Sequence, residues 1–328
     1  MNLTIPQMIE SSHVIIQGRM NSSRLPGKIL LEIAGKPMLQ HVIERAQKAQ
    51  SIGKVIVATT TDPSDDPVAE FCSKNQFACY RGSLLDVLDR YYQASVTFNS
   101  HAIVRLTGDC PLIDPQIIDQ TVLAFWGQFS SLGDISEREY RGISRSSDIH
   151  YSLDSQAFDF ACSRLPPPWK RTYPIGQDVE VCSLQALECA WKEANLPYHR
   201  EHVMPYLYEE CRSVHYTITL GNTLQVEPCL LPTAPLTSSN PFRVLVLNHD
   251  PDYGNQRWTV DTPVDLEFIR QVFKRFPEHE SFNWLEIVHL LEREPELMHI
   301  NTQTRAKDYR EVDERMAMPR TQDNPDTN

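Results

Sequence analysis

The sequence predicts an α/β fold in which a mostly parallel β-sheet carries helices on both faces. Short runs of β-branched and apolar residues recur along the first third of the chain, as expected for buried strands. A single segment with apolar residues at helical spacing separates neighbouring runs. Strands that are joined by single helices run parallel, with right-handed crossovers.

The elements of the first third follow in a regular order. Strands are predicted at 14–17, 54–59, 78–80 and 102–106, and helices around 39–46, at 64–75 and at 84–97. Ligands of such sheets bind at the carboxyl ends of the strands. The loops that follow the first and the last of these strands are therefore the places where a site is expected.

The rest of the chain is less regular. A strand at 179–181 and helices at 183–195, 263–276 and 282–293 are predicted. Alternating apolar residues around Gly221-Asn222 predict a β-hairpin with a two-residue turn, either an arm between subunits or a surface decoration. We expect one domain over 1–301, with insertions near 127–155 and 211–241, and a disordered tail over 302–328.

Composition excludes several classes of protein. The formal charge of −12 over 328 residues argues against nucleic acid as a partner, because nonspecific binding needs a positive field. No apolar run is long enough for a membrane span, and no signal peptide is recognisable. The eight cysteines show no C-x-x-C pair, which predicts reduced thiols in the cytoplasm and no zinc site. We therefore expect neither nucleic acid nor a membrane as a partner.

The loop at 17–28 has the composition of a triphosphate-binding loop. Arg19, Arg24 and Lys28 can neutralise phosphate charge, while serine hydroxyls and backbone N–H groups can surround phosphate oxygens. The loop matches neither G-x-x-x-x-G-K-[ST] nor G-x-G-x-x-G. The alternative is a solvated surface loop, but three cations and two hydroxyls directly after a buried strand favour a site for an anion.

Two aspartates are candidate Mg²⁺ ligands, because Mg²⁺ takes one or two carboxylates together with phosphate oxygens and waters. Asp109 follows a predicted strand, and Asp261 precedes a predicted helix. Helix capping requires neither of them. Asp114 already caps the helix that follows Asp109, and Thr262 with Asp265 forms a variant capping box. An Asx turn is the alternative for Asp109.

Six motifs occur in order: Q-G-R-M-N-S-S-R-L-P-G-K at 17–28, R-G-S-x-x-D-V-L-x-R-Y at 81–91, T-G-D-C-P-L-I-D at 107–114, Y-P-I-G-x-D-V-E-V at 173–181, R-E-H-V at 200–203 and R-W-T-V-D-T-P at 257–263. Together they resemble the spore coat polysaccharide biosynthesis protein F family. These are cytidylyltransferase-like proteins similar to 3-deoxy-manno-octulosonate cytidylyltransferase. The resemblance covers roughly residues 13–301.

The resemblance implies a GT-A-like (nucleotide-diphospho-sugar transferase) fold, a Rossmann-like sheet with helices on both faces. It implies transfer of CMP from CTP to a sugar acid or a sugar phosphate, with release of pyrophosphate, in surface polysaccharide biosynthesis. It further implies that Asp109 and Asp261 hold Mg²⁺ and that the loop cations with Ser22 hold the triphosphate. A homodimer is also expected.

The candidate site residues follow from the loop, the strand ends and the resemblance. We expect the nucleotide to be bound by Gln17, Gly18, Arg19, Ser22, Ser23, Arg24, Lys28, Arg105, Thr107 and Asp109, with Lys28 and Arg19 as catalytic charges. The acceptor would be bound by Glu180, His202 and Arg257.

Each of the weaker candidates has a structural alternative. Arg105 could form a buried ion pair with an aspartate, Glu180 could be a polar edge-strand residue, and His202 could make a structural hydrogen bond. Asp86 and Arg90, one helical turn apart, would form a surface ion pair worth little.

Two other functions compete with this reading. One is a GT-A glycosyltransferase whose metal binds a D-x-D pair, a spelling found at Asp250-Pro251-Asp252, although Pro251 and the following Tyr253-Gly254 favour a turn there. The other is a non-catalytic nucleotide-binding protein. The joint presence of phosphate cations and metal carboxylates disfavours it.

Overall fold

The computed structural model describes residues 4–128, 158–166, 170–209, 213–221, 225–229, 242–276, 282–304 and 310–312. Most of the two predicted insertions and of the predicted tail lies outside these residues. The expected inserted loop and the disorder of the tail therefore stay predictions.

The first third of the chain alternates strands and helices as predicted. Its main elements are β1 (Ser12–Gln17), α2 (Met38–Ala46), β4 (Lys54–Thr60), α3 (Asp66–Lys74), β5 (Ala78–Gly82), α4 (Val87–Thr97), β6 (Ala102–Thr107) and α5 (Pro115–Phe125). The connections add α1 (Ile5–Ser11), the ribbon β2 (Glu32–Ile33) and β3 (Lys36–Pro37), and the 3-10 turns η1 (Lys28–Leu30) and η2 (Pro63–Asp65).

The second half contributes further strands and the C-terminal helices. The strands are β7 (Phe160–Cys162), β8 (Glu180–Ser183), β9 (Ser213–Gly221), β10 (Gln225–Cys229) and β11 (Phe242–Asp250). The helices are α7 (Leu184–Glu193), α8 (Pro197–His202), α9 (Pro205–Tyr208), α10 (Pro263–Arg275), α11 (Trp284–Arg293) and the 3-10 helix η3 (Pro295–Ile300).

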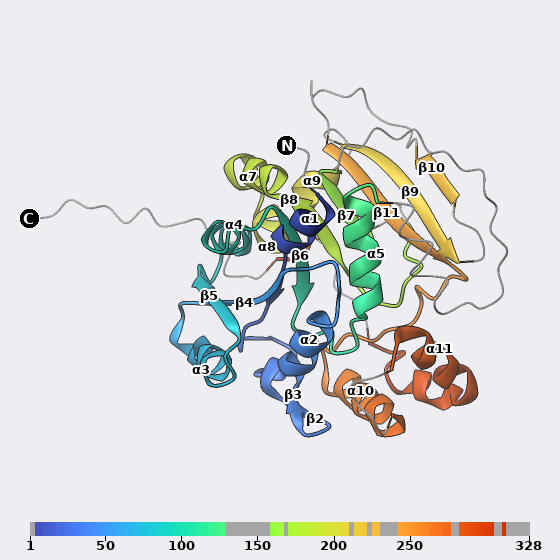
Figure 1. The fold of residues 1–328 in the computed structure, drawn as a ribbon. Coiled ribbons are helices and arrows are strands. Elements are labelled where there is room, and N and C mark those ends of the chain that lie inside the picture. The colour runs from blue at the N-terminus through green and yellow to red at the C-terminus, as the bar shows by residue number, and fades with distance from the viewer. Residues whose placement is uncertain are drawn as a thin grey trace, which may run out of the picture.

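One nine-stranded sheet organises the fold, in the order β10-β9-β11-β7-β8-β6-β1-β4-β5 (Figure 1). Strand β8 runs antiparallel to both of its neighbours, and β10 runs antiparallel to β9. The other strand pairs of this sheet are parallel. The predicted fold class, a mostly parallel α/β sheet, is confirmed.

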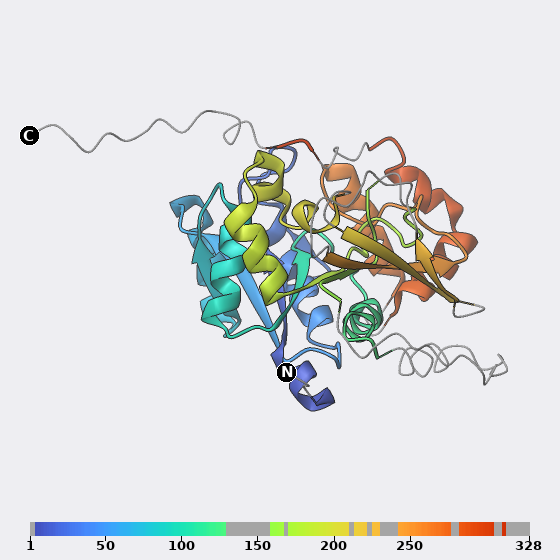
Figure 2. The same cartoon turned by 90° about the horizontal axis from the view of Figure 1, so that it is seen from above.

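Helices cover both faces of the sheet because the buried side chains of each strand alternate between two cores. In β1, Val14 and Ile16 pack into the core that contains α2, α5, α10 and α11. Ile15 packs into the other core, with α4, α7 and α9. Figure 2 shows α10 and α11, in orange and red, on the opposite side of the molecule from α4 and α7.

The predicted helix caps are present. Asp114 accepts a hydrogen bond from Gln116 N at 2.8 Å at the start of α5. At the start of α10, Thr262 and Asp265 form a reciprocal capping box. Asp109 and Asp261 are therefore not used as caps of these helices, as predicted.

Strand β11 was not predicted, because its central apolar run from Val244 to Leu247 is buried and shows no alternation. It lies between β7 and β9 and pairs in parallel with the whole of β9. The predicted hairpin of β9 and β10 therefore extends the main sheet. Its register pairs Thr219 with Gln225, and the predicted turn at Gly221-Asn222 lies partly outside the described residues, which stop at Gly221 and resume at Gln225.

Among the described residues, no helix combines the length and the apolar character that crossing a bilayer requires.

Candidate active site

The loop that leaves β1 is fixed by its own backbone and by the next strand–helix connection. Gly27, at φ +72°, donates its N–H to Met20 O at 2.8 Å and closes the loop on itself. Asp65, fully buried beyond β4, accepts a hydrogen bond from Met20 N at 2.6 Å. It also accepts one from the Thr60 hydroxyl. The loop is thus tied to the carboxyl end of β4.

A cavity of about 1130 Å³ opens where β1 and β6 end. The predicted site residues that line it are Gln17, Gly18, Arg19, Ser22, Ser23, Arg24, Lys28, Thr107, Asp109, His202 and Asp261. Its other lining residues are Asn21, Pro26, Ile29, Gly108, Glu201, Glu311 and Val312. The structure therefore brings most of the predicted site together in one place.

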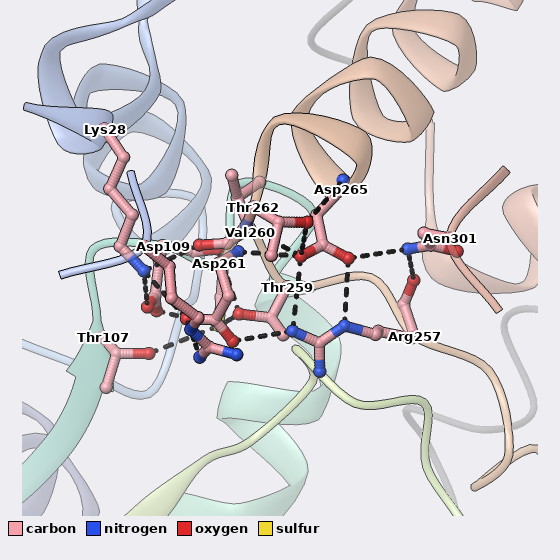
Figure 3. A network of polar contacts seen from close by, with 12 residues as sticks. Lys28, Thr107, Asp109, Arg257, Thr259, Val260, Asp261, Thr262, Asp265 and Asn301 are labelled. Carbon is pink, nitrogen blue, oxygen red and sulfur yellow. Dashed lines mark hydrogen bonds and ion pairs between the residues drawn. The ribbon is translucent and has the colours of Figure 1, made fainter. Parts of the chain in front are cut away.

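Lys28 is the central charge of this cavity (Figure 3). Its Nζ lies 2.7 Å from Asp109 Oδ2 and 3.1 Å from Asp261 Oδ1, and it donates to Val260 O at 2.7 Å. Burial by itself lowers the pKa of Lys28, but attraction to the two carboxylates outweighs burial, so the net pKa is raised. The ammonium therefore stays charged and holds the two aspartates next to each other.

Asp261 is held by three cations from different parts of the chain. Besides Lys28, Arg24 Nη2 lies 2.9 Å from Asp261 Oδ1, and Arg257 Nη2 lies 2.6 Å from Asp261 Oδ2. Burial by itself raises the pKa of Asp261, but the three cations lower it by more than burial raises it. The net pKa therefore lies below its usual range. Asp261 is therefore ionised, and both of its carboxylate oxygens contact cationic side chains.

A close backbone contact supports the segment before Asp261. Ile175 N donates to Gln256 O at 2.8 Å, and Trp258 N donates to Ile175 O at 2.6 Å. Gly176 follows at φ +108°, and a Cβ at that position would lie 2.8 Å from the Trp258 carbonyl carbon. Only glycine lets the two segments approach in this way.

Arg105, Glu180 and Arg257 do not line the cavity. Arg105 and Glu180 face each other on β6 and β8 and form a buried ion pair. Burial alone lowers the pKa of Arg105, but the electrostatic attraction of Glu180 outweighs burial, so the net pKa is raised. The structure thus supplies the buried-pair alternative for Arg105, with a glutamate in place of an aspartate.

His202 reaches the cavity from the end of α8. The next residue, Val203, is fully buried at φ +71° and ψ −59°, and Met204 N donates to His202 O at 2.8 Å. This is a γ-turn, which is strained for a β-branched residue. His202 Nε2 donates to Glu311 O at 2.8 Å, and burial lowers the pKa of His202, so the imidazole is neutral at pH 7.

The predicted surface ion pair of Asp86 with Arg90 was wrong. Asp86 pairs with Arg200 of α8, whose Nε lies 3.0 Å from its carboxylate. Arg90 is fully buried and donates to Ser83 O at 2.7 Å. Burial lowers the pKa of Arg90 to about 10. Sequence spacing alone could not show that α8 supplies the partner.

The donor set of the cavity fits Mg²⁺. Asp109 and Asp261 offer carboxylate oxygens that both lie within hydrogen-bond distance of one Lys28 nitrogen, and Mg²⁺ prefers such oxygens. No cluster of three or more His, Cys, Asp or Glu side chains suited to a metal occurs among the described residues. Two carboxylates suffice where phosphate oxygens and waters complete the octahedron.

The D-x-D spelling at 250–252 begins at the last residue of β11 and continues into a turn, as the sequence suggested. Asp252 Oδ1 accepts a hydrogen bond from Gly254 N at 2.8 Å. Neither Asp250 nor Asp252 lines the cavity. This pair therefore gives no support to the glycosyltransferase alternative.

Outside the two loops that follow β1 and β6, two groups of lining residues were missed from the sequence. Glu201 stands next to His202 in the motif R-E-H-V, and Arg19 Nη2 lies 3.9 Å from its carboxylate. The motif itself could have indicated Glu201. No sequence pattern indicated Glu311 and Val312, which belong to the predicted tail.

Comparison with known proteins places these features in a family. The cytidylyltransferase family matches residues 13–228. Spore coat polysaccharide biosynthesis protein SpsF of Bacillus subtilis is 27% identical over 286 residues, which cover 86% of this chain and 94% of that protein. A 3-deoxy-manno-octulosonate cytidylyltransferase of Geobacter metallireducens is 38% identical over 271 residues, covering 80% and 97%.

A solved structure agrees with these relatives. A cytidylyltransferase of Leptospira borgpetersenii is 27% identical and superposes with a TM-score of 0.64, covering 91% of this chain and 99% of its own. The predicted family, fold class and enzyme class are confirmed. The α/β sheet and the cation-rich loop at the carboxyl ends of its strands therefore belong to a known family. The chain is a member of the cytidylyltransferase family.

Proposed function

We propose that the cavity binds CTP together with Mg²⁺ and that the enzyme transfers CMP to a sugar acid or a sugar phosphate in surface polysaccharide biosynthesis. The convergence of Asp109 and Asp261 on Lys28, within a cavity lined by the loop at 17–28, carries the proposal. The names of the Bacillus and Geobacter relatives support the pathway and the class of acceptor.

The charge of the cavity supports the use of a divalent cation. Arg19, Arg24 and Lys28 line it, but so do four acidic residues, Asp109, Glu201, Asp261 and Glu311. A triphosphate would therefore meet no net positive charge from the side chains alone. Mg²⁺, held by Asp109 and Asp261, would supply the missing positive charge to the phosphate oxygens.

The chemistry requires an acceptor oxygen to form a bond to the α-phosphorus while the bond to the bridging oxygen of pyrophosphate breaks. The acceptor hydroxyl loses its proton to water or to a side chain. Lys28 and Arg19 would stabilise the charge that develops on the phosphates, and Arg24 would orient them. Gln17, Ser22, Ser23 and Thr107 would offer polar groups to the nucleotide.

The acceptor would bind on the wall formed by α8. His202 and Glu201 line the cavity there, and the neutral His202 imidazole can hold a hydroxyl group or take up its proton. Glu180 and Arg257 were also predicted to bind the acceptor. We now propose that they act indirectly, because the one pairs with Arg105 and the other with Asp261.

The proposal is tested by thermal shift with each nucleoside triphosphate plus Mg²⁺, followed by pyrophosphate release across a panel of sugar acids and sugar phosphates. We expect the largest shift with CTP, because the family is that of cytidylyltransferases. A larger shift with UTP or ATP contradicts the proposal. Pyrophosphate release with no acceptor of the panel would revive a non-catalytic role, and hydrolysis of a nucleotide sugar would revive the glycosyltransferase.

Matched variants separate the metal carboxylates from other acids. Asp109→Asn should abolish most pyrophosphate release, whereas Asp252→Asn, in the turn beyond β11, should leave it unchanged. Full turnover by Asp109→Asn would show that Asp109 does not hold the metal.

We also propose a cytoplasmic location and a homodimer. The described cysteines include free thiols at Cys72, Cys79, Cys110, Cys162, Cys182 and Cys189, as is usual in a reducing compartment. Light scattering on the purified protein tests the dimer, and the mass of a monomer would contradict it.

A further inference from the structure

A chain of buried polar contacts leads from Asn301, at the end of η3, to Asp261, the proposed metal ligand. Asn301, only 4% exposed, follows η3, and its side-chain amide donates to Arg257 O at 3.0 Å and to Asp265 Oδ1 at 3.1 Å. Asp265 in turn accepts from Arg257 Nε at 3.0 Å. Arg257 then reaches Asp261, as Figure 3 shows.

The two carboxylate oxygens of Asp261 contact different side chains. Arg257 Nη2 holds Oδ2 at 2.6 Å, while Oδ1 faces Lys28 and Arg24 in the cavity. With Oδ2 fixed, the plane of the carboxylate cannot rotate freely. Outer partners of this kind orient metal ligands in other proteins.

Asp265 does more than a helix cap requires. Besides closing the capping box with Thr262, it accepts a hydrogen bond from Asp261 N at 3.0 Å and binds the Arg257 guanidinium. Asn301 connects Arg257 and Asp265 to the C-terminal part of the chain. Because Asp265 is fully buried, loss of a donor at Asp265 cannot be replaced easily by water.

We propose that Asn301 is a positioning residue, which acts through Asp265 and Arg257 to fix Asp261 for the divalent cation. This inference rests on the proposed function, because it assumes that CTP binds with Mg²⁺. It assigns a role in the metal site to Asn301, which lies 40 residues beyond Asp261 in sequence and does not line the cavity.

The test is calorimetric titration of CTP into the purified enzyme, without and with Mg²⁺. In the wild type, Mg²⁺ should strengthen CTP binding. In Asn301→Ala, the metal-free affinity should stay the same while the strengthening by Mg²⁺ falls about tenfold or more. The Mg²⁺ concentration for half-maximal pyrophosphate release should rise by the same factor.

Two further variants complete the test. Thr302→Ala is the matched control, because within the described ranges its exposed hydroxyl makes one hydrogen bond, to His299 O at 3.4 Å. Arg257→Lys keeps the charge but cannot span Asp261 and Asp265 with one planar fork, and should lose the Mg²⁺ effect as well. If Asn301→Ala does not fold, the Arg257→Lys variant still tests the proposal.

The outcomes separate this inference from the proposed function. A wild type that shows no Mg²⁺ effect on CTP binding contradicts the function itself. A wild type with the effect, and Asn301→Ala and Arg257→Lys variants that retain all of it, overturns the positioning role alone. Equal loss of CTP affinity with and without Mg²⁺ would mark Asn301 as merely structural and overturn it too.

Discussion

At the residue scale, Lys28 shows how one side chain can organise a site. An ammonium group has three N–H donors, and those of Lys28 meet Asp109, Asp261 and Val260 O. All three contacts are short, and the side chain is buried. The position of this charge is therefore defined by the protein before any phosphate arrives.

The ionisation of Asp261 makes stability depend on pH. Its folded pKa is depressed, so its contribution is present above the unfolded value of about 3.9 and is lost as pH falls through the folded pKa. The difference in unfolding free energy between wild type and Asp261→Asn should shrink as pH falls below about 4. Urea denaturation at a series of pH values measures it, and a constant difference down to about pH 3 would contradict the assignment.

At the element scale, the conformation of the loop at 17–28 depends on a side chain outside the loop. Asp65 belongs to η2, yet it holds the loop through Met20 N and holds β4 through the Thr60 hydroxyl. A buried donor that loses its acceptor costs about 1–3 kcal/mol. The loop should therefore be sensitive to a residue that never touches the nucleotide.

We expect Asp65→Ala to weaken CTP binding and to lower the unfolding free energy by about 1–3 kcal/mol. Asp66→Ala is the control, because its carboxylate is 49% exposed and pairs at the surface with Arg81, a contact worth about 0–1 kcal/mol. Chemical denaturation and calorimetry measure the two effects. Equal behaviour of the two variants would show that Asp65 does not anchor the loop.

At the scale of the whole molecule, one sheet joins the two halves of the chain. Strand β8 pairs with β6 of the first half and with β7 of the second. The core that contains α2 and α5 also contains α10 and α11. The two halves are therefore connected by the hydrogen bonds of one sheet and by a common apolar core.

This continuity predicts that residues 1–301 unfold as one cooperative unit. Tryptophan fluorescence reports on both cores, because Trp258 and Trp284 lie in one and Trp191 packs against the other, and circular dichroism reports on the helices. Both signals should give the same urea midpoint. Two separate midpoints would mean that the chain consists of two domains.

The sequence was informative wherever chemistry is local. Cations directly after a strand indicated the loop, and the caps Asp114 and Thr262 left Asp109 and Asp261 as the candidates for metal binding. The alternation of strands and helices in the first third was also readable, because each strand is separated from the next by one amphipathic segment.

Long-range pairing could not be predicted in this way. The partner of Arg105 depends on an antiparallel strand, β8, inserted between parallel ones, and the partner of Asp86 comes from α8. Arg257 looked like an acceptor ligand because its position near Asp261 in sequence does not show that Asp265 fixes its guanidinium or that Asn301 binds its carbonyl oxygen. Such contacts arise only when the chain is folded.

The close backbone approach at Gly176 gives the glycine of the Y-P-I-G motif a structural role. The motif looks like a ligand-binding signature, yet its glycine is needed because the backbone of Trp258 occupies the space of a Cβ. Selection at this position would act on the shape of the support beneath Asp261, whatever acceptor the enzyme uses. A side chain at position 176 would therefore disturb this support whichever sugar the enzyme accepts.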